Sequence, residues 1–403
     1  MKLNGSDIIA EVLIEQGVDT IFGYPGGAVL NIYDALYKYR DKIHHILTAH
    51  EQGASHAADG YARATGKTGV VIATSGPGAT NLVTGIATAY MDSIPMVAIT
   101  GNVGTSYIGK DAFQEVYITG ITMPITKHNF FVSDIKELAP TLREAFKIAN
   151  SGRKGPVLVD IPKDVTAAIT EYEKAAPEVI IDNTVINEDE VKKAAALINK
   201  AKRPVIEIGG GVVSSEASDL VRMLVNKTGA PCCHTLMAAG VLGYSEKLNY
   251  GLVGMHGSFV TNKAIDEADV LVAIGTRFSD RVALNTNRFA HKAKVIQIDI
   301  DLSEIDKNVK VDHALVGDVK TIVMDLLHYV KQSDRTDWLK TLDEYKNSDY
   351  HPVDSDKFIT PHQLIRAICE NVPKDTVYVT DVGQHQMWAA QYLEHTDPRS
   401  FLT

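Results

Sequence analysis

The first residue whose type and position could do chemistry is Glu51. It lies in the segment 47–66, where a short apolar run gives way to a helical pattern. In a parallel α/β sheet such a junction lies at the edge where ligands bind, so a carboxylate there could contact a ligand. An acidic residue in the first turn also complements the dipole of a helix without any ligand. The spacing alone favours this second, structural interpretation.

A tight turn between a strand and a helix is the second candidate. Its residues, 75–78, read Ser-Gly-Pro-Gly, and they leave backbone N–H groups free at the start of the following helix. Such free donors could serve a ligand. A compact connection between the two elements would have the same sequence, so the turn by itself does not decide between a binding role and a structural one.

Two glycine-containing segments match nucleotide-binding loops less well. Gly66, Lys67 and Thr68 match the end of a phosphate loop, but position 61 is tyrosine where the first glycine is required. A strand also follows this segment instead of preceding it, so we predict that Gly66 ends a helix. The triplet 209–211 does follow a predicted strand, yet it lacks the GxGxxG spacing and is a weak nucleotide signal.

The composition is typical of a globular protein with more than one domain. The 403 residues, 45% hydrophobic and 22% charged, are too many for one ordinary core and indicate two or three domains. The net charge of −10 argues against nucleic acid as a partner. Without a membrane-spanning run, a signal peptide or a transit peptide, the chain is expected to be cytoplasmic and free of membrane contact. The 3 cysteines fit neither disulfides nor a zinc site, so we expect buried free thiols.

Alternating strands and helices predict an α/β fold. Apolar runs separated by amphipathic ones indicate successive doubly wound parallel-sheet domains, each sheet covered on both faces. An N-terminal helix is expected to have Ser6 as its N-cap and to stop at Gly17. The other early predictions are strands at 44–48, 69–74, 95–100 and 156–160, and helices at 29–40, 51–64, 78–90 and 135–150.

Three domains and two linkers are expected along the chain. The predicted order is a domain at 1–165, a linker at 166–187, a domain at 188–335, a linker at 336–357 and a third start at 358–403. The second domain is predicted to contain a helix at 187–201, a strand with its glycine turn at 205–211, and strands at 270–275 and 294–301. The third start is predicted to contain a helix at 361–372, a strand with its turn at 376–383, a helix from Gln384 and the opening of a strand at 400–403. Because so few units cannot complete a parallel sheet, we expect the third domain to be truncated.

Short motifs then follow one another in a familiar order along nearly the whole chain. The first domain contains YPGGAVLNIYDAL (24–36), AHEQGA (49–54), GYARATGKTGV (60–70), SGPGATN (75–81), DSIPMVAITG (92–101), DAFQE (111–115), ITKHNF (125–130) and GPVLVDIPKDV (155–165). Later motifs are GGGVV (209–213), GMHG (254–257), GTRFSDR (275–281), IDIDLSEIDKN (299–308) and GQHQMWAAQY (383–392). By these motifs the chain resembles the catalytic large subunit of acetolactate synthase (acetohydroxyacid synthase), a thiamin-diphosphate-dependent family.

The resemblance implies a reaction and the residues that carry it. Such an enzyme decarboxylates pyruvate on thiamin diphosphate and joins the two-carbon unit to pyruvate or 2-ketobutyrate, in the biosynthesis of valine, leucine and isoleucine. Glu51 and Gln114 would be catalytic, Glu51 by sharing a proton with the aminopyrimidine ring. Further implied contacts of thiamin diphosphate are Tyr24, Pro25, Gly26, Gly27, Pro77, Asn81, Gln384 and His385. Phe113 and Lys163 would line the substrate channel, although Lys163 also fits a solvated linker lysine.

The resemblance also implies an FAD site and a magnesium site. The three domains would bind the pyrimidine ring, FAD and the diphosphate in turn, and the flavin would be structural. The implied FAD contacts are Arg153, Gly209, Gly210, Gly211, His256, Gly275, Arg277, Asp299 and Asp318. The family binds Mg²⁺ through a Gly-Asp-Gly segment and a downstream Asn, which this chain lacks, so no metal ligand is expected within it and the chain alone is expected to be inactive.

Partners and alternatives follow from the same resemblance. The family implies a homodimer or homotetramer and a small regulatory subunit. A pyruvate-oxidase-like thiamin-diphosphate flavoenzyme would share the fold and cofactors, but DAFQE and ITKHNF favour the synthase. A non-catalytic flavin-binding or interaction protein is the third possibility, and it would have no reason to keep Glu51, Gln114 and the pocket glycines together.

Overall fold

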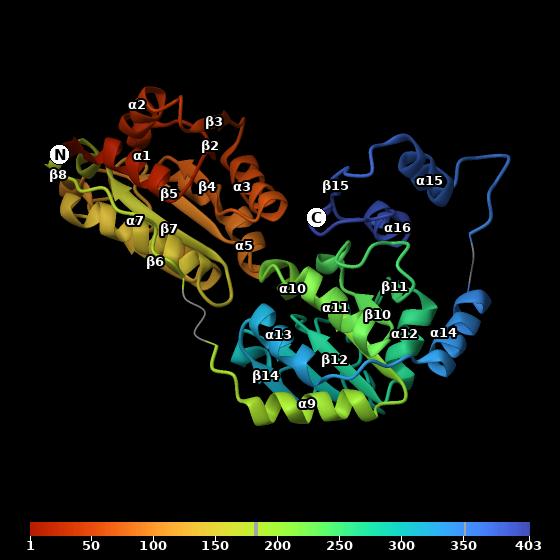
Figure 1. Ribbon diagram of the computed structural model, residues 1–403. Helices are drawn as coiled ribbons and strands as arrows, with labels where there is room; N and C mark the ends of the chain where they lie inside the picture. The colour runs from red at the N-terminus through yellow and green to blue at the C-terminus, as the bar shows by residue number, and fades with distance from the viewer. Residues whose placement is uncertain (181–183, 350–351) are drawn as a thin grey trace. The chain divides into compact units, whose positions relative to one another are not determined.

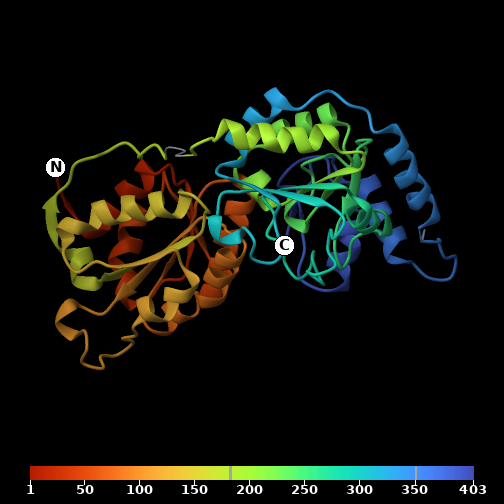
Figure 2. The ribbon, with the colours of Figure 1, turned by 90° about the horizontal axis from the view of Figure 1, so that it is seen from below.

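The protein is described by a computed structural model over residues 1–180, 184–349 and 352–403, which forms two compact units, Met1–Ile181 and Asp182–Thr403 (Figure 1). Each unit contains a six-stranded parallel sheet with helices on both sides (Figure 2). The predicted α/β class with doubly wound parallel sheets is therefore confirmed. Among the described residues, no helix combines the length and the apolar character that crossing a membrane requires.

The first unit has the strand order β3-β2-β4-β5-β7-β6. Its strands are β2 (Thr20–Gly23), β3 (His44–Leu47), β4 (Gly69–Ala73), β5 (Met96–Asn102), β6 (His128–Phe131) and β7 (Pro156–Pro162). Its longer helices are α1 (Gly5–Glu15), α2 (Leu30–Lys38), α3 (Glu51–Thr65), α5 (Val83–Met91) and α7 (Ile135–Asn150), and its short ones are α4 (Pro77–Thr80), α6 (Ile118–Thr122) and α8 (Lys163–Ala167).

Alternate residues of the central strands face opposite layers of this unit. Val70 and Ile72 of β4 pack with α1, α2 and α7, whereas Val71 and Ala73 pack with α3 and α5. Because both faces of such a strand are covered by helices, every residue of β4 is buried, and the strand appears in the sequence as a continuous apolar run. The helix predicted at 78–90 is divided into α4 and α5.

Three local predictions have different outcomes. Gly66 ends α3 in the left-handed conformation (φ 76°), as predicted. The Ser6 cap was wrong: α1 begins after Asn4, whose Oδ1 accepts hydrogen bonds from the Asp7 backbone N–H (2.8 Å) and from the Ser6 hydroxyl (2.9 Å). The stretch expected as a linker at 166–187 contains β8 (Ile169–Glu171), which pairs antiparallel with β1 (Lys2–Asn4), and residues 181–183 of it lie outside the described residues.

The second unit has the strand order β11-β10-β9-β12-β13-β14. Its strands are β9 (Pro204–Ile208), β10 (Cys232–His234), β11 (Asn249–Leu252), β12 (Val270–Ile274), β13 (Lys294–Asp299) and β14 (His313–Val316). Helices α9 (Glu188–Lys200), α11 (Ser218–Thr228) and α13 (Val319–Tyr329) cover one face, α12 (Phe259–Glu267) and α14 (Thr336–Ser348) the other, and the short α10 (Gly210–Ser214) follows β9. Helix α14 occupies most of the stretch expected as a linker at 336–357, because Trp338 and Leu342 are buried against α12.

The last part of the chain adds a small subdomain to the second unit. It contains α15 (Pro361–Asn371), β15 (Tyr378–Val379), α16 (Gln384–Tyr392) and β16 (Phe401–Leu402), and the two strands pair in parallel. Ile365, Ala389 and Phe401 pack with Leu252 and Ala239 in one apolar cluster. The helix and strand predictions here are confirmed in kind, and the strand expected with its turn at 376–383 is limited to β15.

Candidate functional site

The first sheet has a switch point between β2 and β4. From β2 the chain passes to β3 on one side, whereas β4 leads to β5 on the other side. Ligands of open parallel sheets bind where neighbouring connections diverge in this way, outside the carboxyl ends of the strands. The loop 24–27 follows β2, the turn 74–76 follows β4, and Glu51 begins α3 after β3. The structure therefore brings these predicted residues to one edge of the sheet.

The buried side chain of Thr74 is the point on which these loops pack. Its hydroxyl oxygen accepts a hydrogen bond from the Ala28 backbone N–H (3.2 Å). A Cβ atom at Gly26 would lie 2.5 Å from the Thr74 Cβ, and one at Gly78 would lie 2.6 Å from its Cγ2. Both glycines are therefore required because their backbones approach Thr74 more closely than any side chain would permit.

Glu51 is buried at this edge, with 8% of its surface exposed. Its Oε2 accepts a hydrogen bond from Asn81 Nδ2 at 3.0 Å. Its Oε1 lies 3.1 Å from where a Cβ at Gly78 would be, and among the described residues no hydrogen bond to this oxygen is found. Glu51 is in the first turn of α3, as the helix-dipole interpretation requires, yet its carboxylate is buried between loops instead of meeting solvent at the helix end.

The electrostatic effect of Glu51 extends to Tyr33 on α2. Burial, and then the negative charge of Glu51, raise the pKa of the Tyr33 phenol well above its usual range. The Tyr33 hydroxyl is buried without a hydrogen-bond partner among the described residues and lies 2.6 Å from where a Cβ at Gly23 would be. Tyr33 therefore stays a neutral phenol beside the carboxylate of Glu51.

Gln114 reaches the same edge through its backbone. A Cβ at Gly76, whose φ is +61°, would lie 2.7 Å from the Gln114 carbonyl oxygen and 2.9 Å from its Cα. Gln114 itself has a φ of 61°, which is uncommon for a residue other than glycine. The structure therefore places Gln114 against the turn that follows β4, although 38 residues separate it from Gly76.

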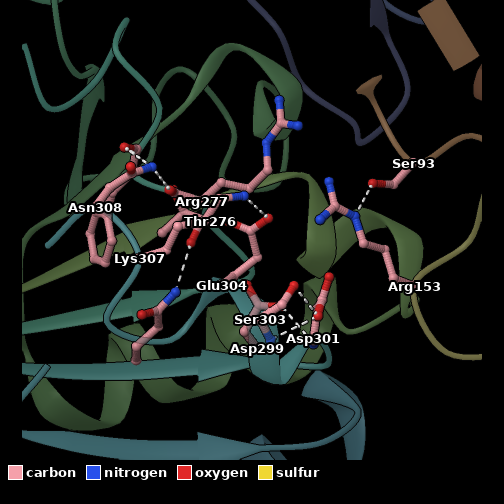
Figure 3. Close-up of polar contacts among 12 residues, drawn as sticks. Ser93, Arg153, Thr276, Arg277, Asp299, Asp301, Ser303, Glu304, Lys307 and Asn308 are labelled. Carbon is pink, nitrogen blue, oxygen red and sulfur yellow. Dashed lines mark hydrogen bonds and ion pairs between the residues drawn. The ribbon is translucent and has the colours of Figure 1, made fainter. Parts of the chain in front are cut away.

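The remaining predicted residues of the first unit differ in position. Tyr24, Pro25 and Pro77 are exposed at the edge described above, Phe113 is 88% exposed, and Lys163 is exposed at the start of α8. Arg153 lies before β7, at the opposite, amino end of the sheet, and its Nε donates a hydrogen bond to Ser93 Oγ at 2.8 Å (Figure 3). Within the first unit, Arg153 is therefore not brought together with Glu51.

The second sheet has its own switch point, between β9 and β12. Numbered along the chain, its strands have the order 3-2-1-4-5-6, which is that of dinucleotide-binding sheets. The triplet Gly209–Gly211 follows β9 and Gly275–Arg277 follows β12, so the two loops meet at this point. A Cβ at Gly209 would lie 2.3 Å from the Gly275 carbonyl oxygen, and the Gly211 backbone N–H donates to that oxygen (3.0 Å). The glycines are required for this contact between two backbones.

The other predicted residues of the second unit also lie after its strands. Asp299 ends β13 and accepts a hydrogen bond from the Asp301 backbone N–H (2.9 Å; Figure 3). Asp318 is the N-cap of α13, and its Oδ1 accepts from the backbone N–H groups of Lys320 and Thr321. His256 accepts a hydrogen bond at its carbonyl oxygen from Gln391 Nε2 (2.7 Å), and Gln384 and His385 are exposed at the start of α16.

Two buried acids beneath these edges were missed in the sequence. Glu207 of β9 accepts a hydrogen bond from the Thr276 hydroxyl (2.9 Å), and burial raises its pKa to about 7. Asp160 of β7 accepts from Thr100 (2.7 Å) and Asn102 (2.5 Å), and burial raises its pKa to about 6. The signal that could have found them is a single charged residue inside an otherwise apolar strand.

Comparisons with known proteins identify the class to which these two sheets belong. Residues 3–121 match the family described as thiamine pyrophosphate enzyme, N-terminal TPP binding domain, and residues 191–326 match thiamine pyrophosphate enzyme, central domain. The chain is thus built from domains of thiamine pyrophosphate enzymes, and the predicted thiamin-diphosphate family is confirmed.

Curated relatives give the particular family. The chain is 47% identical, over 99% of its length, to the probable acetolactate synthase large subunit of Methanocaldococcus jannaschii, of which it covers 70%. It is 48% identical, over its whole length, to the acetolactate synthase of Mycobacterium leprae, of which it covers 66%, and 45% identical to the acetolactate synthase isozyme 2 large subunit of Escherichia coli, of which it covers 72%. The chain belongs to the acetolactate synthase large-subunit family, and it spans about two thirds of the length of such relatives.

Proposed function

We propose that the protein is an acetolactate synthase, which decarboxylates pyruvate and transfers the two-carbon unit to pyruvate or 2-ketobutyrate. The observation that carries this proposal is the buried carboxylate of Glu51 at the switch point of the first sheet, with one oxygen held by Asn81. The names of the relatives support the same reaction. The same relatives favour a synthase over a pyruvate-oxidase-like enzyme, because they are named acetolactate synthases.

The edge around Thr74 fits the pyrimidine half of thiamin diphosphate. The loops at Gly26 and Gly78 pack directly on Thr74, and beside Gly78 the Oε1 of Glu51 has no hydrogen bond among the described residues, which leaves a carboxylate oxygen for the ring. When bound, thiamin diphosphate supplies the nucleophilic carbon that adds to the keto group of pyruvate. Glu51 would exchange a proton at Oε1 with the ring, while the hydrogen bond from Asn81 holds Oε2 in place.

The other assignments around this cofactor follow from the family. Tyr24, Pro25, Gly27 and Pro77 would contact the pyrimidine ring, Gln114 and Phe113 would face the substrate, and Lys163 would line its channel. Gln384 and His385 would contact the diphosphate, for which Mg²⁺ is the ion we propose because it prefers oxygen ligands. In domain terms, we propose residues 1–165 for the pyrimidine, 188–335 for FAD and 358–403 for the start of the diphosphate-binding domain.

The direct test of this function is the product that the purified intact protein forms from pyruvate, where intact means a subunit of the relatives' full length that contains this chain. We expect acetolactate, with a rate that falls to background when thiamin diphosphate and divalent metal are removed by dialysis with a chelator. Activity should return when both are added back. Peroxide and acetyl phosphate in place of acetolactate would instead indicate the oxidase-like reaction.

FAD is the cofactor we propose for the second unit. The switch point between β9 and β12 and the glycine contact there support a dinucleotide site. In the second unit, the proposed contacts are Gly209–Gly211, His256, Gly275, Arg277, Asp299 and Asp318, and the family implies Arg153 as a further contact. Asp318 would contribute through its position after β14, since its carboxylate already caps α13. We propose a structural role for the flavin.

The FAD proposal predicts visible flavin absorbance in the purified intact protein and its loss on one substitution. Arg277→Ala should weaken FAD binding by on the order of 10- to 100-fold, since it removes a charged hydrogen-bond donor. The matched control is Arg281→Ala in the same motif, because that side chain is 68% exposed and paired with Asp280. A wild-type protein that shows no flavin absorbance after FAD has been added and the unbound flavin removed would contradict the site.

Partners and location complete the proposal. We propose a homodimer or homotetramer and a smaller regulatory subunit, the latter supported by relatives that are named large subunits. We propose a cytoplasmic location, which is supported by the three free cysteines, Cys232, Cys233 and Cys369, because disulfides are rare in that compartment.

A further inference from the structure

The side chain of Glu115 folds back onto its own loop, residues 109–115. Its Oε1 accepts a hydrogen bond from the Gly109 backbone N–H at 2.5 Å, and its Oε2 accepts from the Ala112 backbone N–H at 3.0 Å. The Glu115 backbone N–H in turn donates to the Ala112 carbonyl oxygen at 2.9 Å. The carboxylate is therefore the centre around which this loop closes. These hydrogen bonds, that of Gly109 first, lower the pKa of Glu115, so it is ionised at neutral pH.

The loop needs these hydrogen bonds because the conformation of its backbone is unfavourable. Asp111 and Gln114 both have positive φ values, 54° and 61°, in a stretch of only seven residues. Residues other than glycine adopt this conformation at a cost in free energy and keep it where surrounding contacts enforce it. Phe113 lies between them and is 88% exposed, so apolar packing of its side chain does not hold the loop.

The ends of the loop are fixed to the sheet of the first unit. On the amino-terminal side, the Thr105 backbone N–H (3.0 Å) and hydroxyl (2.5 Å) donate to the Asp164 carboxylate, next to the end of β7. On the other side, the Gln114 backbone lies against Gly76 in the turn after β4. Between these two points, the Glu115 carboxylate accepts the backbone hydrogen bonds of Gly109 and Ala112.

We propose that Glu115 is a positioning residue, whose carboxylate holds loop 109–115 in the conformation that presents Gln114 and Phe113 at the edge of the first sheet. This inference rests on the proposed function for the role of Gln114 in the reaction. The claim about the loop conformation stands on its own contacts, so the two can fail separately.

The loop claim is tested by hydrogen–deuterium exchange of peptides covering residues 105–117 in the intact protein, and by the rate of trypsin cleavage after Lys110. Glu115→Ala should raise both rates by on the order of tenfold, since it removes charge-assisted hydrogen bonds, and Glu115→Gln should have an intermediate effect because an amide oxygen still accepts. Exchange in the rest of the protein should be unchanged. Glu115→Ala with the wild-type exchange rate in this loop would overturn the proposal.

Asp111→Asn is the matched control. This substitution neutralises a carboxylate in the same loop, and in the described part of the chain no hydrogen bond to that carboxylate is found. Asparagine also tolerates the positive φ of this position. This variant should keep the wild-type exchange rate. A loop that loosens as much in Asp111→Asn as in Glu115→Ala would show that negative charge, and not the two backbone hydrogen bonds, holds it, and would overturn the proposal.

The role of Glu115 in the reaction is tested by a double variant. If Glu115 acts through Gln114, Glu115→Ala should lower kcat and leave the binding of thiamin diphosphate unchanged, and Glu115→Ala with Gln114→Ala should be no slower than Gln114→Ala alone. If the losses in kcat of the two single variants multiply in the double variant, the positioning role is overturned. If the wild type formed no acetolactate, the proposed function would fail, while the exchange experiment would still decide on the loop.

Discussion

The Glu51→Gln variant of the intact protein should form acetolactate more slowly than the wild type by on the order of 10²–10⁴-fold, the usual contribution of one general acid–base group. The introduced amide has the size and shape of the carboxylate, and its oxygen can still accept the hydrogen bond from Asn81. It cannot take up and return a proton. The substitution therefore separates proton exchange from packing, and the melting temperature should stay close to that of the wild type.

The measurement is the initial rate of acetolactate formation at saturating pyruvate and thiamin diphosphate. Gln52→Ala is the control, because its side chain is the exposed neighbour of Glu51 on the first turn of α3. This control should retain the wild-type rate. A near-normal rate in Glu51→Gln would show that Glu51 only complements the dipole of α3 and takes no part in proton exchange.

The second large effect is expected on stability, for Arg63→Ala. Arg63 of α3 has 4% of its side chain exposed and donates to Asp59 (2.8 Å) and to Asp92 after α5 (2.8 Å). Removing the cation leaves Asp59 buried without its partner, and such changes lower the free energy of unfolding by about 3–5 kcal/mol. Burial raises the pKa of Asp59, whereas the neighbouring Arg63 lowers it, so the charged form of Asp59 depends on Arg63. Urea unfolding followed by circular dichroism gives the difference.

Two controls separate a buried ion pair from a positive charge as such. Lys147→Ala removes a cation that is paired with Glu144 and Glu178 on the surface of α7, and its effect should be small. Asp59→Leu combined with Arg63→Met should recover much of the loss, because an apolar pair can replace a buried ion pair. An Arg63→Ala variant that unfolds at the wild-type urea concentration would show that the ion pairs of Arg63 do not stabilise the protein.

The sequence predicted the two sheets well because their strands are buried on both faces. Runs such as 69–73 and 157–159 are apolar throughout, so no period is needed to find them. Helix α14 was missed for the opposite reason: only Trp338 and Leu342 are buried in an otherwise polar stretch. Strands β1 and β8 are three residues each and pair over more than 160 residues, which no local pattern indicates.

The candidate site was predictable at its strand ends but not in its contacts. Glu51 could be placed at a junction of strand and helix, since both flanking patterns are local. Its hydrogen bond with Asn81 spans 30 residues, and the contact of Gly76 with Gln114 depends on how the loop after β5 returns to the sheet. Such tertiary contacts are set by the path of the whole chain. The cap of α1 shows the same limit at short range, since Asn4 and Ser6 are both good capping residues.

The packing around Thr74 has a consequence for anyone who builds variant libraries to change substrate choice. Gly26, Thr74 and Gly78 form one steric unit, so a larger residue at any of the three would need compensating changes at the others at the same time. Randomising these positions singly would mostly yield misfolded clones. Diversity is better placed at the exposed side chains of Tyr24 and Pro25, in the loop of Gly26, and of Phe113, in loop 109–115.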